Sequence, residues 1–105
     1  MSDLEIVRAC AEAMFPDNRV KNALEGVFYE DYPGVWVSFE PLTNDAQAFQ
    51  LMKRLSINVW GSDISANEWK WHACWNFQDT DDTLGNGDTP NRAICECVAK
   101  MRAKP

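Results

Sequence analysis

The segment from Glu68 to Gln78, EWKWHACWNFQ, alternates between apolar and polar side chains. A period of two predicts a β-strand, because successive side chains of a strand point to opposite faces of a sheet. A shift of one residue would exchange every side chain between the faces, so the pattern also predicts which face is buried. The buried face is expected to hold Trp69, Trp71, Trp75 and Phe77, and the polar face Lys70, His72 and Asn76.

Three other segments have apolar residues at helical spacing. Ser2 and Glu5 have the spacing of a capping box, which predicts a helix over 3–14. A second helix is expected over 44–55, where Ala48, Leu51, Met52 and Leu55 share one face. Thr89 as a cap and Pro90 at the first helical position predict a third helix over 90–102.

The remaining segments predict short strands and one loop. Aromatic and β-branched residues flank a turn at 32–34, so we expect a strand at 35–40 that pairs with a shorter one at 27–30. Residues 56–60 predict another short strand, and 16–25 could hold a short helical turn. The polar segment DTDDTLGNGDTP predicts an exposed loop. The resulting order is α-β-α-β-β-α, which indicates a single α+β domain over residues 1–105.

Composition and charge limit the classes of function. The chain has 105 residues, of which 46% are hydrophobic, and its formal charge is −6. A net negative charge repels phosphates, so direct nucleic-acid binding is not expected. The N-terminus lacks the pattern of a signal peptide, and no apolar run approaches the roughly 18 residues of a membrane span. We therefore expect a cytoplasmic protein with no membrane contact, in which Cys10, Cys74, Cys95 and Cys97 stay reduced.

No residue pattern predicts a catalytic site, a metal site or a cofactor. His72-x-Cys74 and Cys95-x-Cys97 lack the ligand spacing of zinc sites. The loop after Asp79 has Leu84 where a calcium loop needs glycine, which excludes an EF-hand and leaves only a looser contact with calcium or magnesium open. His72 is the only histidine, and no orienting acid is evident beside it.

Two helical segments carry a resemblance to a known family. They are PLTNDAQAFQLMKRLSI and TPNRAICECVAKM, with tryptophan-rich strands between them, and together they span roughly residues 35–103. This arrangement resembles the phage ABA sandwich domain family, small proteins of bacteriophages and prophages. The resemblance implies a layered helix-sheet-helix sandwich with a sheet of three or four strands, and a protein that works in an infected bacterial cell. It implies no shared catalytic residues.

Carboxylates gather in two stretches that contain no Lys or Arg. One lies between Lys21 and Lys53, and the other is the loop near residues 79–88. Such segregation favours a basic protein partner, so we expect a non-enzymatic protein that binds a host protein, for instance a component of host defence or replication. The expected contact residues are Glu30, Asp31, Trp36, Trp60, Asp79, Asp81, Asp82 and Asp88.

Two alternatives stay open at this point. One is a small enzyme of unrecognised type that uses His72. The other is a structural protein that assembles with itself, since three helices over a small sheet could leave an edge or part of a face for a homodimer to cover.

Overall fold

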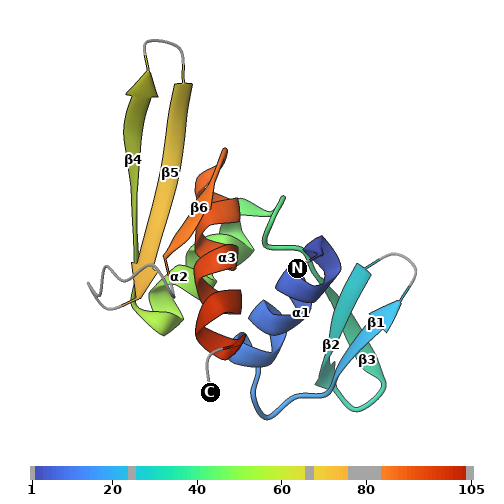
Figure 1. Cartoon of the computed structure of the whole chain (residues 1–105). Coiled ribbons are helices and arrows are strands. Elements are labelled where there is room, and N and C mark those ends of the chain that lie inside the picture. Colours follow the sequence, from blue (N-terminus) through green and yellow to red (C-terminus); the bar gives the residue numbers. More distant parts are fainter. Residues whose placement is uncertain (1, 24–25, 66–67, 76–83, 104–105) are drawn as a thin grey trace.

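The computed structural model describes residues 2–23, 26–65, 68–75 and 84–103 (Figure 1). The elements confirm an α+β chain with three helices and two antiparallel sheets of three strands each. In chain order they are α1 (Asp3–Met14), β1 (Val20–Ala23), β2 (Gly26–Tyr32), β3 (Val35–Phe39), α2 (Asp45–Leu55), β4 (Ile57–Ser65), β5 (Glu68–Trp75), β6 (Gly85–Gly87) and α3 (Pro90–Ala103).

All three helices begin at the predicted caps. At α1 the Glu5 backbone N–H donates to Ser2 Oγ at 3.2 Å, while the Ser2 backbone N–H donates to Glu5 Oε1 at 3.3 Å. At α2 the Gln47 backbone N–H donates to Asn44 Oδ1 at 3.0 Å. These bonds satisfy donors that the first turn of a helix leaves unpaired, which is why short polar residues mark the boundaries so well.

The first sheet has the order β1-β2-β3, and its strand β1 lies where the sequence predicted a helical turn. That prediction was wrong, because Val20–Ala23 pairs with β2 along its whole length, with Val20 opposite Tyr29 and Ala23 opposite Gly26. Val20 is half-buried while Lys21 is exposed, which is the alternation of a strand. Four residues are too few for a period to be visible in the sequence, so pairing with β2 decides the conformation.

The second sheet has the order β4-β5-β6, and β6 lies within the segment that was predicted to be a loop. That part of the prediction was wrong, because Gly85 pairs with Ala73 and Gly87 pairs with Trp71 of β5. A Cβ atom on Gly85 would lie 2.5 Å from the backbone nitrogen of Cys97 in α3. Glycine at this position therefore allows β6 to pack directly against the helix.

The tryptophan-rich strand follows the predicted pattern only in its middle. Ala73 is buried and Trp71 packs against the core, as expected. Trp75 is 38% exposed and Cys74 is buried, so the prediction was wrong at the end of β5. The reason is that β6 pairs only with residues 71–73, where its glycines let α3 approach closely. Lys70 and His72 are half-buried, while Asn76, Phe77 and the side chain of Trp69 lie outside the described residues.

The core is continuous between the two sheets, with the helices in the middle (Figure 1). Helix α1 packs against β2 on one side and α3 on the other, and α3 packs against β5 and β6. The strands are thus divided between two sheets that flank the helices, whereas the family resemblance implied a single sheet of three or four strands between helices. The largest fully buried side chains are Phe39, Leu51, Val27, Val98, Pro41, Cys10, Cys95 and Cys97.

Candidate functional site

The outer face of the first sheet brings together three of the predicted contact residues. Glu30 of β2 lies directly opposite Trp36 of β3, and Asp31 follows at the end of β2. Helix α1 covers the other face of this sheet, and no described helix covers the outer one (Figure 1). We call this surface, together with the adjoining β2–β3 turn, the hairpin face; it comprises Arg19, Lys21, Phe28, Glu30 and Trp36 on the outer face, and Asp31, Tyr32 and Val35 at the turn end.

Two cations from β1 and the residue before it lie on the Trp36 indole. Lys21 Nζ is 4.2 Å from the ring centroid, and the Arg19 guanidinium carbon is 5.5 Å from it. Both distances are in the range of cation–π attraction, worth about 0.5–1 kcal/mol at exposed sites. The sequence missed this contact, because both residues precede the stretch without Lys or Arg, and the antiparallel pairing of β1 with β2 folds them back over it.

The Glu30 carboxylate mainly contacts other groups of the same chain. Its side chain is only 16% exposed, and Oε1 lies 3.7 Å from Arg19 Nη1. The backbone N–H of Gly34 donates to Oε2 at 3.0 Å, which ties the carboxylate to the β2–β3 turn. Asp31, in contrast, is exposed. The hairpin face is therefore of mixed charge, and Asp31 is the carboxylate that it presents to solvent.

Large apolar side chains are exposed where the hairpin turns. Tyr32 is 68% exposed and Val35 is 49% exposed, and they are register partners across the turn. Trp36 follows Val35 on β3, so its side chain points to the opposite face of the sheet, and Tyr32 and Val35 add exposed apolar area at the turn end of the hairpin. Tryptophan, tyrosine and arginine are the residues most enriched among energetically dominant contacts of protein interfaces, and this face has one of each.

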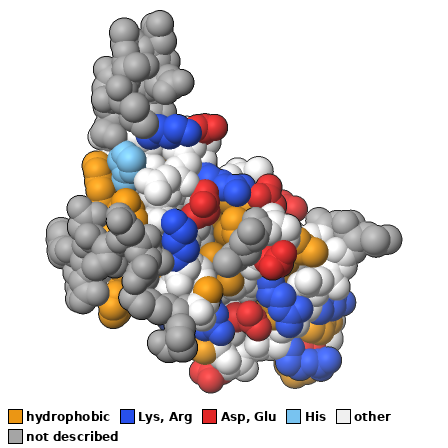
Figure 2. Space-filling view, in the orientation of Figure 1, with side chains coloured by type: hydrophobic (Ala, Val, Ile, Leu, Met, Phe, Trp, Pro, Cys, Tyr) orange, Lys and Arg blue, Asp and Glu red, His pale blue; other side chains and the backbone are white. Residues whose placement is uncertain are grey.

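Trp60 lies on the second sheet, next to His72. The two residues are register partners on β4 and β5, their ring centroids are 5.6 Å apart, and Trp60 is 37% exposed. His72 Nδ1 lies 2.6 Å from Asn86 Oδ1 of β6, so the imidazole is held between two strands. Figure 2 shows the single histidine in pale blue beside hydrophobic side chains.

The second predicted acidic segment is described only at its end. Asp88 Oδ1 lies 2.9 Å from Lys70 Nζ, and the hydrogen bond from Lys70 lowers the pKa of Asp88. Asp79, Asp81 and Asp82 lie outside the described residues. On the face drawn in Figure 2, acidic and basic side chains are interspersed. Charges that are segregated along the sequence are thus mixed on that surface.

All four cysteines are in the thiol form, without a disulfide, and all are buried. Burial raises the pKa of Cys97 to about 11. The pKa of Cys10 is also raised, first by hydrogen bonding with Cys95 and then by burial. A raised pKa keeps a thiol protonated and therefore a poor nucleophile. Within the described ranges, no group of three or more His, Cys, Asp or Glu side chains is arranged to hold a metal ion.

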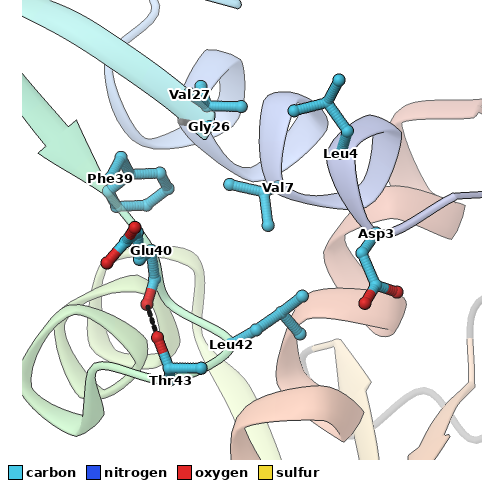
Figure 3. Close-up of a pocket in the computed structure, with 9 residues that line it drawn as sticks. All are labelled: Asp3, Leu4, Val7, Gly26, Val27, Phe39, Glu40, Leu42 and Thr43. Carbon is cyan, nitrogen blue, oxygen red and sulfur yellow. Dashed lines mark hydrogen bonds between the residues drawn. The ribbon is translucent and has the colours of Figure 1, made fainter. Parts of the chain in front are cut away.

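A small apolar pocket opens between α1, the start of β2, the end of β3 and the loop before α2 (Figure 3). Its volume is about 230 Å³. Figure 3 shows Asp3 and Glu40 on opposite sides of the space. The lining residues are Asp3, Leu4, Val7, Gly26, Val27, Phe39, Glu40, Leu42 and Thr43.

The sequence did not predict this pocket, because its walls come from four segments that meet only in the folded chain.

None of the described helices is long and apolar enough to cross a membrane. In comparisons with known proteins, no family model and no curated protein matches this chain.

Proposed function

We propose that this chain is a non-enzymatic protein that binds another protein through the hairpin face. The observation that carries the proposal is the largely exposed Tyr32 at the turn and the half-buried Trp36 on the outer face, with Arg19 beside Trp36. The half-buried indole and the largely exposed tyrosine leave apolar area accessible to solvent. Aromatic anchors of this kind supply most of the binding energy at protein interfaces.

The acidic character of the proposed surface centres on Asp31. The carboxylate is exposed and lies at the turn end of the hairpin face, whereas Glu30 is paired with Arg19. A basic partner would gain in association rate from Asp31 and from the net charge of −6, and added salt would reduce that gain. Asp88, which follows β6, adds to the same attraction from the second sheet; Asp79, Asp81 and Asp82 belong to this proposal but lie outside the described residues.

The biological setting in this proposal comes from the resemblance to the phage ABA sandwich domain family. A phage or prophage protein acts in an infected bacterial cell, so the partner would be a host protein, for instance a component of host defence or replication. This part rests on the resemblance and on fold-level analogy, while the contact surface rests on the geometry of the hairpin face.

Catalysis by His72 has less support. The imidazole is held by Asn86 and lies against Trp60. His72 does not line the pocket of Figure 3. An enzyme site needs a concave space for substrate next to its titratable group. The geometry around His72 in the described part of the chain therefore supports catalysis less than the hairpin face supports binding.

Affinity capture from a bacterial lysate tests the proposal. We expect a protein that is retained in stoichiometric amount by the wild type and lost by the double change Tyr32→Ser and Trp36→Ala. The matched control is Trp60→Ala, which removes an exposed indole from the other sheet. Retention that survives the double change, or that is lost equally with Trp60→Ala, would show that the hairpin face is not the interface.

A further inference from the structure

The pocket in Figure 3 has the size of one side chain. A dry cavity of about 150 Å³ holds a benzene ring, so a space of about 230 Å³ accommodates one aromatic or branched aliphatic side chain. Pockets for cofactors and drug-sized ligands usually occupy roughly 300–1,000 Å³. The dimensions therefore favour an anchoring side chain of a protein over a small metabolite.

The charge around the pocket is negative. Among the described residues that line it, Asp3 and Glu40 are the titratable ones, and none is Lys or Arg. Asp3 Oδ1 accepts a hydrogen bond from Arg92 Nη1, so its charge is already compensated within the chain. The Glu40 carboxylate has no ion-pair partner among the described residues, and its side chain is exposed. The occupant that fits is an apolar side chain with a cation beside it.

The chain itself presents such a side chain on α2. Phe49 is 55% exposed, and Lys53 Nζ lies 5.5 Å from the centroid of its ring. Arg54 is the next residue and is also exposed. Phe49 and Lys53 are four residues apart on one helix, which places them on the same face. An exposed phenyl ring beside an ammonium group complements an apolar pocket beside a carboxylate.

The pocket and Phe49 are also near each other along the chain. Thr43 lines the pocket two residues before α2 begins, and Phe49 lies four residues into the helix, which is about 6 Å along its axis. A surface that holds both halves of a complementary contact can pair with itself by two-fold symmetry, because each copy then fills the pocket of the other.

We propose that two copies of this chain associate through this surface, with Phe49 of each copy in the pocket of the other and Lys53 near Glu40. This self-association is separate from the binding by the hairpin face that we propose above, and either can fail alone. The buried phenyl ring holds the dimer together, while the exposed charges at its edge set orientation and association rate more than affinity.

Sedimentation equilibrium tests the proposal, over roughly 1 µM to 1 mM so that a weak dimer is not missed. We expect a monomer–dimer equilibrium whose dissociation constant rises at least about 100-fold in Phe49→Ser, because the symmetric anchor is lost twice. Val35→Ser is the matched control, since it removes a similarly exposed apolar side chain from the hairpin face and leaves dimerisation unchanged. A strictly monomeric wild type, or a dimer unaffected by Phe49→Ser, overturns the proposal.

A charge exchange provides the sharper test. Glu40→Lys and Lys53→Glu should each weaken the dimer several-fold, and the double variant should recover it, because the pair is restored with opposite polarity. Asp17→Lys is the control for a change of net charge alone. No recovery in the double variant contradicts the placement of Lys53 near Glu40. In a sample that mixes labelled and unlabelled chains, contacts between the Phe49 ring and the methyl groups of Val7 and Leu42 should appear between copies.

Discussion

Replacing Gly85 by alanine tests the close contact between β6 and α3. The new Cβ atom would lie 2.5 Å from Cys97 N and 2.9 Å from Cys97 Cβ, whereas ordinary van der Waals contacts begin near 3.4 Å. The Ala93 carbonyl oxygen would lie closer still, so helix α3 would have to withdraw by at least about 0.9 Å, because the atoms in contact are mainly backbone and cannot rotate away. A displacement of this size forfeits a quarter to a half of the dispersion energy of each contact that it opens.

Two opposing effects determine how much Gly85→Ala changes the free energy of unfolding. Overpacking a well-filled site costs about 1–3 kcal/mol, and a clash with backbone belongs at the upper end of that range. Alanine also restricts the unfolded chain, which returns about 0.4–1 kcal/mol. We therefore expect Gly85→Ala to lower the free energy of unfolding by about 2–2.6 kcal/mol. For a chain of 105 residues this corresponds to a fall in Tm of roughly 9–12 °C.

Guanidinium unfolding followed by tryptophan fluorescence measures this change. Gly34→Ala is the control, because its Cβ would meet no atom within 4 Å although its φ of +83° makes alanine strained. That variant should lose only about 1–2 kcal/mol, the cost of a left-handed conformation. If the free energy of unfolding of Gly85→Ala lies within about 0.5 kcal/mol of the wild-type value, α3 does not pack closely against β6 at Gly85.

Three further predictions concern the caps, the charges and the thiols. Ser2→Ala should destabilise the fold by about 1 kcal/mol in thermal unfolding, through loss of the capping box, and Ser2→Asp should restore most of it. Lys70→Met should raise the pKa of Asp88 toward its ordinary value, as measured in a carboxyl NMR titration. Because the pKa of Asp88 is lowered in the folded chain, the ion pair stabilises the fold at pH values above the unfolded pKa near 3.8. This stabilisation is lost as the pH falls through the pKa of the folded chain. All four thiols should react with a disulfide reagent in denaturant, and far more slowly in the folded protein at pH 8, since all are buried; equal rates would contradict that burial.

The sequence predicted the helices well and the strands incompletely. Helix boundaries came from caps such as Ser2 and Asn44, which act through hydrogen bonds with residues three positions away and are therefore visible locally. Strands β1 and β6 were missed because each depends on a partner distant in the chain. Gly85 looked like a loop residue, although its lack of a side chain is what lets a strand pack on α3.

For the candidate surfaces, too, the sequence predicted local features and missed those that depend on distant segments. Trp36 was expected to contact a partner because it is a large aromatic residue whose spacing does not assign it to the core, and it does lie on a sheet face that no described helix covers. The cations beside it were not expected, since Lys21 reaches the indole only after β1 pairs with β2. The pocket was not expected at all, because no periodicity or motif relates Leu4 to Phe39.

The packing of α1 on α3 has a consequence for the order of folding. Cys10 Sγ donates to the Cys95 carbonyl at 3.5 Å across a separation of 85 residues, and Asp3 pairs with Arg92 across 89. Contacts this distant require closure of a long loop, which slows folding relative to local contacts. During synthesis, α1 and the first sheet emerge early but leave the buried side of α1 bare until residues 90–103 arrive. A nascent chain stalled before α3 should therefore be a target for chaperones and proteases.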